Sequence, residues 1–139
     1  AASPLQRCRG LAAALIERRP DLGPCSFDAS IAEMDFGSWE GQAWSAIPRT
    51  EFDAWAADFG DAAAGGSGES TGLFMRRVAV AYDAWISEGR DALWVTHAGV
   101  IRAVWLLHAG TRRVASAGQW PGTAIEPGEC VSIEAPPRR

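Results

Sequence analysis

The chain has 139 residues, of which 47% are hydrophobic, and it carries a formal net charge of −4. That length supports one domain with one buried core, so we expect a single domain over residues 1–139. The acidic balance, the scattered arginines and the lack of a long apolar run argue against nucleic-acid and membrane partners.

The first part of the chain begins with a helix signal. Ser3 and Pro4 are residue types that suit an N-cap and a first helical position, and apolar residues then recur at three- and four-residue steps. A helix is therefore predicted from there to about Arg19. A short strand is expected over residues 25–28, followed by a turn-rich stretch.

The middle of the chain has two helical regions that a glycine-rich stretch separates. Aromatic residues recur at roughly helical spacing over residues 44–59, and Pro48 divides them into two predicted lid segments. Residues 62–68 are small and rich in glycine, which is typical of a mobile connection. A longer helix is predicted after Ser70, a suitable N-cap residue, and should end near Gly89.

The last third of the chain adds two strand patterns and one helical pattern. Residues 92–96 form an almost wholly apolar run, as expected of a parallel strand that is buried on both faces. A helix is predicted over residues 100–108 and a final short strand over residues 130–133. Together the patterns predict an α/β fold, a three-layer sandwich with a mostly parallel central sheet.

The cysteines bear on the cellular compartment. Cys8, Cys25 and Cys130 are odd in number and widely spaced along the chain. This pattern fits neither a disulfide framework nor a pair of zinc ligands. We therefore expect a cytoplasmic protein without a metal site.

The most informative local unit is residues 93–102, in which His97 follows a predicted buried strand and precedes a helix. Free backbone N–H groups at a helix start favour a bound anion. Gly99 allows the backbone to approach a ligand closely. On this unit alone, a histidine that merely forms a hydrogen bond at the strand end is an equal alternative.

Four short pieces carry a stronger signal together: SPLQR at residues 3–7, EMDFGSWEG at 33–41, GES at 68–70 and VTHAG at 95–99. In this order they resemble the histidine phosphatase superfamily, also called the phosphoglycerate mutase-like family. The second piece and residues 54–58 most resemble its alpha-ribazole phosphatase branch, which acts in cobalamin biosynthesis. The resemblance implies phosphomonoester hydrolysis through a phosphohistidine, on a small phosphorylated metabolite and without a metal or organic cofactor.

The resemblance implies roles for three residues. Arg7 matches an arginine that binds phosphate, for which a guanidinium fork is well suited, and its structural alternative is a surface arginine. His97 matches the family's second histidine, which donates a hydrogen bond to the transferring phosphoryl group. Glu33 matches the proton donor, with Asp35 and Glu40 as competing acids and an ion pair with an arginine as the structural alternative.

One element of the family pattern is missing. The family's phosphoryl-accepting histidine lies in an Arg-His-Gly unit at the end of the first strand, and this sequence contains no such unit. His108 lies late in a predicted helix and is interpreted as a structural or surface residue. We therefore expect a domain without the N-terminal strand and nucleophile, inactive as given.

Two further sets of residues need an interpretation. Trp39 and Trp44 follow Glu33 and are candidates to stack on an aromatic leaving group. Glu69 and Ser70 are explained by the start of a helix, with the mouth of the pocket as an alternative place for them. Arg102 and Arg76 or Arg77 are interpreted as structural or rim charges.

Three alternatives stay open. A phosphoglycerate mutase or a broad sugar-phosphate phosphatase would use the same core residues, because the lid sets specificity. A natural pseudoenzyme would bind a phosphorylated ligand without catalysis. A plain α/β domain with chance matches is the third alternative, and the number of matching pieces argues against it.

Overall fold

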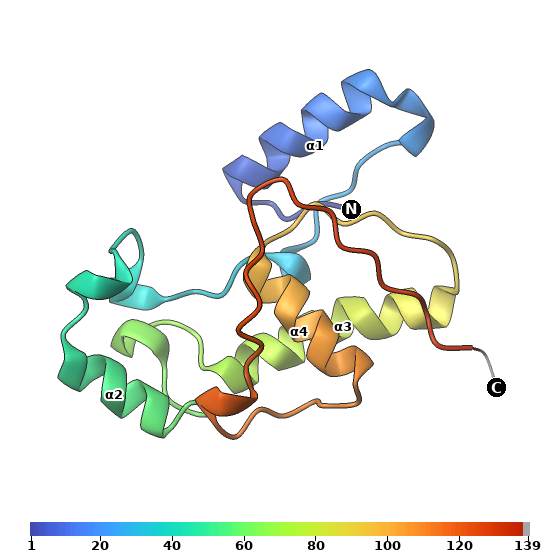
Figure 1. The fold of residues 1–139 in the computed structure, drawn as a ribbon. Coiled ribbons are helices and arrows are strands. Elements are labelled where there is room, and N and C mark those ends of the chain that lie inside the picture. The colour runs from blue at the N-terminus through green and yellow to red at the C-terminus, as the bar shows by residue number, and fades with distance from the viewer. Residues whose placement is uncertain (138–139) are drawn as a thin grey trace.

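The computed structural model describes residues 1–137, and its main elements are helices. They are α1 (Gln6–Arg18), α2 (Arg49–Ala57), α3 (Thr71–Glu88) and α4 (Ala98–His108). Short 3-10 turns lie at Pro20–Leu22, Ala29–Ile31, Gly37–Trp39, Trp44–Ala46, Ala64–Gly66 and Ala117–Gln119. Figure 1 shows α3 and α4 crossing in the centre, with α1 and α2 far apart on either side of them. None of the helices in this part of the chain is long and apolar enough to cross a membrane.

The predicted α/β sandwich with a central sheet is wrong, because residues 1–137 contain no β-strand. The segments expected as the first two strands pair with residue 2 alone, through isolated parallel bridges from Ala2 to Phe27 and to Val95. A ladder needs several consecutive paired residues. Soon after Ala2 the chain enters α1, which begins at Gln6. The first segment is therefore too short to extend its pairing with the segments that contain Phe27 and Val95.

The third expected strand is also absent among the described residues. Residues 130–133 have no bridge to any other described segment. Val131 and Ile133 are half-buried, whereas their neighbours in the segment are exposed. The alternating pattern therefore reflects an extended segment with one covered side, without a partner strand.

Local signals in the sequence correctly predicted α3, and they placed α4 to within two residues of its start. α3 begins after Ser70, whose Oγ accepts a hydrogen bond from Leu73 N at 3.1 Å. It ends at Gly89, which adopts the left-handed conformation that favours glycine. The two helical segments expected over residues 44–59 are present as a 3-10 turn and α2, on either side of Pro48.

The start of α1 differs from the prediction. The helix begins at Gln6, with Leu5 as its N-cap residue and without a side-chain cap, and does not begin at Pro4. Ser3 is fully buried, and its Oγ lies 2.8 Å from His97 Nε2. The predicted capping serine therefore belongs to the interior of the protein, beside the histidine of the most informative unit.

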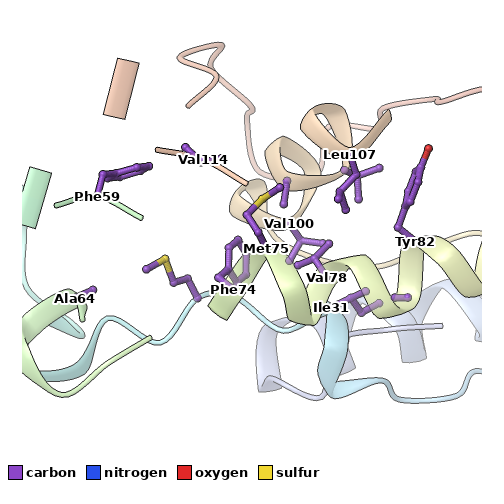
Figure 2. Close-up of a cluster of buried hydrophobic side chains, with 14 of the residues drawn as sticks. Ile31, Phe59, Ala64, Phe74, Met75, Val78, Tyr82, Val100, Leu107 and Val114 are labelled. Carbon is purple, nitrogen blue, oxygen red and sulfur yellow. The ribbon is translucent and has the colours of Figure 1, made fainter. Parts of the chain in front are cut away.

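Two groups of buried apolar side chains hold the helices together. Figure 2 shows the larger cluster between α3 and α4, in which Phe74, Met75, Val78 and Val100 are 0% exposed. Burial of one such side chain stabilises the fold by about 1.5–3 kcal/mol. The smaller cluster joins α1 to the segment before α4 and consists of Ala2, Cys8, Ala12 and Val95. His97 lies along the chain between residues of the two clusters.

The glycine-rich residues 62–68 are packed against residues 35–39, which corrects the prediction of a mobile connection. Ser38 Oγ donates to Gly65 O at 2.7 Å. A Cβ atom at Gly65 or at Gly68 would overlap the backbone of residues 35–39. The glycines therefore permit two backbone segments to approach each other closely.

Candidate active site

His97 lies at the start of α4, where its ring is almost wholly buried. It is the N-cap residue of the helix and is 6% exposed. Its Nε2 atom lies 2.8 Å from Ser3 Oγ and 3.4 Å from Cys8 Sγ. Just before it, Thr96 Oγ1 donates a hydrogen bond of 2.6 Å to Ile31 O. Residues from three distant parts of the chain therefore fix the position of the imidazole.

Arg7 contacts the other nitrogen of the same ring. Its Nε–H group donates to His97 Nδ1 at 3.3 Å. A ring whose Nδ1 accepts must carry its proton on Nε2, so we assign Ser3 Oγ as the acceptor of that proton. Arg7 is exposed, and its Nη atoms have no hydrogen-bond or ion-pair partner within residues 1–137. Two guanidinium nitrogens therefore remain available to an anion.

The surroundings of His97 keep its ring neutral. Burial, followed by the positive charges of Arg7 and Arg77, lowers the pKa of His97 from 6.5 to about 4. At neutral pH the imidazole therefore has one donor and one acceptor nitrogen. A bound anion would favour the protonated ring, so anion binding and protonation of His97 are coupled.

Glu33 reaches the same helix start from a different segment. Its Oε2 accepts a hydrogen bond from Gly99 N at 3.3 Å, and its Oε1 accepts one from Met34 N at 3.0 Å. A Cβ atom at Gly99 would overlap the Glu33 carboxyl group. The glycine that the sequence linked to close ligand approach thus makes room for this carboxyl group, which the N–H groups of the first turn of α4 attract.

The structure brings together the three site residues that were predicted from the sequence. Arg7 and His97 are in direct contact, and Glu33 contacts the backbone two residues beyond His97. The competing acids Asp35 and Glu40 accept hydrogen bonds of 2.8 Å from N–H groups of their own loop and none from α4. Of the three acids, Glu33 is therefore the one that lies at the start of α4, close to His97.

Three neighbours of these residues were not recognised from the sequence. Ser3 was interpreted as a helix cap, Cys8 as part of a helix face, and Arg77 as a structural or rim charge. Arg77 is half-buried, and its Nη2 donates to the carbonyl oxygen of Glu33 at 3.2 Å. These contacts join residues that are far apart in the sequence, and local patterns do not predict such contacts.

The two tryptophans expected near the ligand differ in exposure. Trp39 is 6% exposed, and its Nε1 donates to Glu51 Oε2 at 3.2 Å, so it belongs to the core. Trp44 is 56% exposed and stacks on Trp55, with ring centroids 6.4 Å apart. A pocket of about 140 Å³ lies beside Trp44. Of the two, Trp44 is the one that can offer a face to a ligand.

His108 is remote from this site. It is the last residue of α4, and its Nδ1 lies 3.3 Å from Tyr82 Oη. An α-helix rises about 1.5 Å per residue, so His97 and His108 are separated by on the order of 16 Å along the axis. In the described part of the chain, no group of three or more His, Cys, Asp or Glu side chains is arranged to hold a metal ion.

Comparison with known proteins identifies the family. The family model of the histidine phosphatase superfamily (branch 1) matches residues 1–125, which include Arg7, Glu33 and His97. A search of curated proteins finds no match. The chain belongs to the histidine phosphatase superfamily, and this membership indicates chemistry of the phosphatase or mutase type.

Proposed function

We propose that this chain binds the phosphoryl group of a small phosphomonoester at the amino end of α4, as part of a site for phosphomonoester hydrolysis through a phosphohistidine. The observation that carries the proposal is the convergence of Arg7, Glu33 and His97 on one helix start. Family membership supports the same class of reaction.

Each of the three residues has a role that its surroundings support. The free Nη atoms of Arg7 bind two phosphoryl oxygens in a bidentate manner. Both nitrogens of the neutral His97 ring are engaged, by Ser3 and by Arg7. A bound phosphoryl group favours the protonated ring and draws the Arg7 guanidinium toward itself, so that His97 can then donate a hydrogen bond to it and stabilise the charge that develops on it. Where a histidine nucleophile is supplied, Glu33 would give its proton to the leaving alkoxide as the bond from phosphorus to that oxygen breaks and a bond from phosphorus to the imidazole forms. It would later accept a proton from the water that hydrolyses the phosphohistidine.

These three residues do not supply the nucleophile of the reaction. A phosphohistidine requires an imidazole on the side of phosphorus opposite the leaving group, and the chain's other histidine, His108, lies at the far end of α4. We therefore expect phosphate binding without turnover. With p-nitrophenyl phosphate as substrate, the rate should not exceed that of His97→Ala, and robust turnover by this chain would contradict the assignment.

The lack of a second imidazole within reach also favours the second candidate function. In that case the chain is a non-catalytic module that binds a phosphorylated ligand. The two candidates differ once a histidine nucleophile is supplied from a longer chain, because an enzyme should then hydrolyse phosphomonoesters and a binding module should not.

Calorimetric titration with inorganic phosphate tests the site itself. Arg7→Ala should weaken binding at least about tenfold, because a charge-assisted hydrogen bond contributes about 1.5–3 kcal/mol. Arg9→Ala is the matched control, since Arg9 lies on the same helix but its guanidinium covers the Phe27 ring, 4.7 Å from its centroid. Equal losses in the two variants would point to overall charge and against a phosphate site at Arg7.

The substrate that we propose is alpha-ribazole 5′-phosphate. Two features support it: the resemblance of residues 33–41 and 54–58 to that branch, and the exposed ring of Trp44 beside a pocket of about 140 Å³. Trp44→Ala should weaken binding of alpha-ribazole 5′-phosphate and leave the affinity for inorganic phosphate unchanged. No change for either ligand would contradict stacking on Trp44.

A further inference from the structure

The guanidinium group of Arg77, in the first half of α3, is surrounded by acceptors. Its Nε and Nη2 atoms donate to the two carboxylate oxygens of Glu69, each at 2.8 Å. Its Nη1 donates to three carbonyl oxygens within residues 29–32, at 2.9 to 3.1 Å, and its Nη2 donates to Glu33 O at 3.2 Å. One side chain therefore holds the backbone segment that carries Glu33.

Glu69 extends this attachment to the residues after Glu33. Its Oε2 accepts a hydrogen bond from Asp35 N at 2.9 Å, while its own N–H donates to Asp35 O at 2.8 Å. The side chains of Arg77 and Glu69 are 25% and 21% exposed, so water only partly reaches the pair. Burial by itself raises the pKa of Glu69, but the hydrogen bonds from Arg77 and Asp35 N outweigh it and lower this pKa, which keeps the carboxylate ionised.

The segment needs such an attachment because regular structure does not provide one. Residues 32–36 lie between two 3-10 turns and belong to no helix or strand. From this loop, Glu33 must place its carboxyl 3.3 Å from Gly99 N. A displacement of the order of 1 Å at a reacting group can cost about a hundredfold in rate. The backbone of this loop therefore has to be held firmly.

We infer that Arg77 and Glu69 are positioning residues, which hold residues 29–35 so that the Glu33 carboxyl lies at the amino end of α4. This inference rests on the proposed function, in which Glu33 transfers a proton to the substrate. An ion pair with a merely structural role would stabilise the fold and leave the contact between Glu33 and Gly99 unaffected.

The amide of Gly99 measures this contact directly, because its N–H group donates to Glu33. In ¹H–¹⁵N NMR spectra at neutral pH, Glu33→Gln should shift this resonance, because the substitution replaces the carboxyl group that accepts the hydrogen bond. In the Arg77→Ala background, the Gly99 shift that Glu33→Gln causes should fall by at least half.

Arg112→Ala is the matched control, because it also removes an ion pair that involves a residue of α3. Arg112 binds both carboxylate oxygens of Asp83 in α3 and has no hydrogen bond to residues 29–35. In the Arg112→Ala background, the Gly99 shift that Glu33→Gln causes should be unchanged. Arg77→Lys keeps the charge but lacks the planar fork, so it should restore only part of this shift.

Two results would overturn the inference. One is a full Gly99 shift on Glu33→Gln in the Arg77→Ala background together with reduced thermal stability, and the other is an equal loss of this shift in the Arg112→Ala background. If Arg77→Ala does not fold, Glu69→Gln decides in the same way, because it keeps an acceptor for Asp35 N and removes the ion pair. Phosphate affinity is measured separately: an intact Gly99 shift on Glu33→Gln without phosphate binding contradicts the proposed function alone.

Discussion

The two sides of the candidate site are held in different ways. The ring of His97 is fixed by burial and by short contacts with Ser3, Cys8 and one nitrogen of Arg7. The loop of Glu33 is fixed by the charged hydrogen bonds of Arg77. Burial disfavours a charge on the imidazole, whereas an ion pair requires charge. The His97 side should therefore respond to protonation and the Glu33 side to removal of a charged partner.

Acidification, which acts on His97, should lower the free energy of unfolding more than any single substitution considered on the Glu33 side. Because the pKa of His97 falls from 6.5 to about 4 on folding, the unfolded chain binds this proton at a higher pH than the folded chain. The part of the free energy of unfolding that depends on a neutral His97 is fully present above about pH 6.5. It is lost as the pH falls toward 4, by about 3 kcal/mol.

Urea unfolding at a series of pH values measures this effect. His97→Gln removes the titrating group, so the stability advantage of the wild type over this variant should shrink between pH 6.5 and about 4. A difference that does not change with pH would show that burial does not control this histidine.

Arg77→Ala should have the next largest effect, on the Glu33 side. It leaves the carboxylate of Glu69 partly buried without its partner, and the free energy of unfolding should fall by about 2–3 kcal/mol. Arg112→Ala should cost less than about 1 kcal/mol, because both partners of its ion pair are more than half exposed. Urea denaturation at neutral pH compares the two variants, and equal losses would contradict the distinction.

Ser3→Ala should have a smaller effect on the His97 side. It removes the acceptor of the His97 Nε2 proton, which should cost about 1–2 kcal/mol. In a double-mutant cycle with His97→Gln, the two substitutions should be coupled by at least about 0.5 kcal/mol. Additive losses, measured by thermal or urea unfolding, would show that this hydrogen bond does not stabilise the protein.

Gly99→Ala should change stability least and still alter the site. Alanine favours a helix over glycine by about 0.5–1 kcal/mol, and the overlapping group is the flexible end of Glu33. Gly10→Ala, in α1 with open space around it, gives the gain in helix propensity alone. Against this control, Gly99→Ala should lose the shift that Glu33→Gln causes at the amide of position 99, and a retained shift would contradict the contact.

The sequence predicted the helices better than the pairing of extended segments. Ser70 and Gly89 are local signals that lie at the two ends of α3, where the structure has them. The expected sheet depends on pairing between distant segments, and within residues 1–137 the segments expected as strands pair through no more than single bridges from Ala2 to Phe27 and Val95. An apolar run shows that a segment is buried and does not show how many residues it pairs.

The same distinction applies to the site. The resemblance carried by short motifs implied Arg7, Glu33 and His97, and the structure brings them together at one helix start. The roles of Ser3 and Arg77 depend on contacts across 94 and up to 48 residues of sequence. No local pattern contains that information, so capping and surface charge were reasonable interpretations of these residues.

The central claim is that residues from three distant segments form one site for a phosphoryl group, and a phosphate titration followed by ¹H–¹⁵N NMR tests it most directly. We predict that the Arg7 Nε–H, the His97 ring and the Gly99 amide shift together with a single dissociation constant, and that Arg7→Ala abolishes these shifts. Shifts scattered over the exposed arginines, with different dissociation constants, would contradict the account.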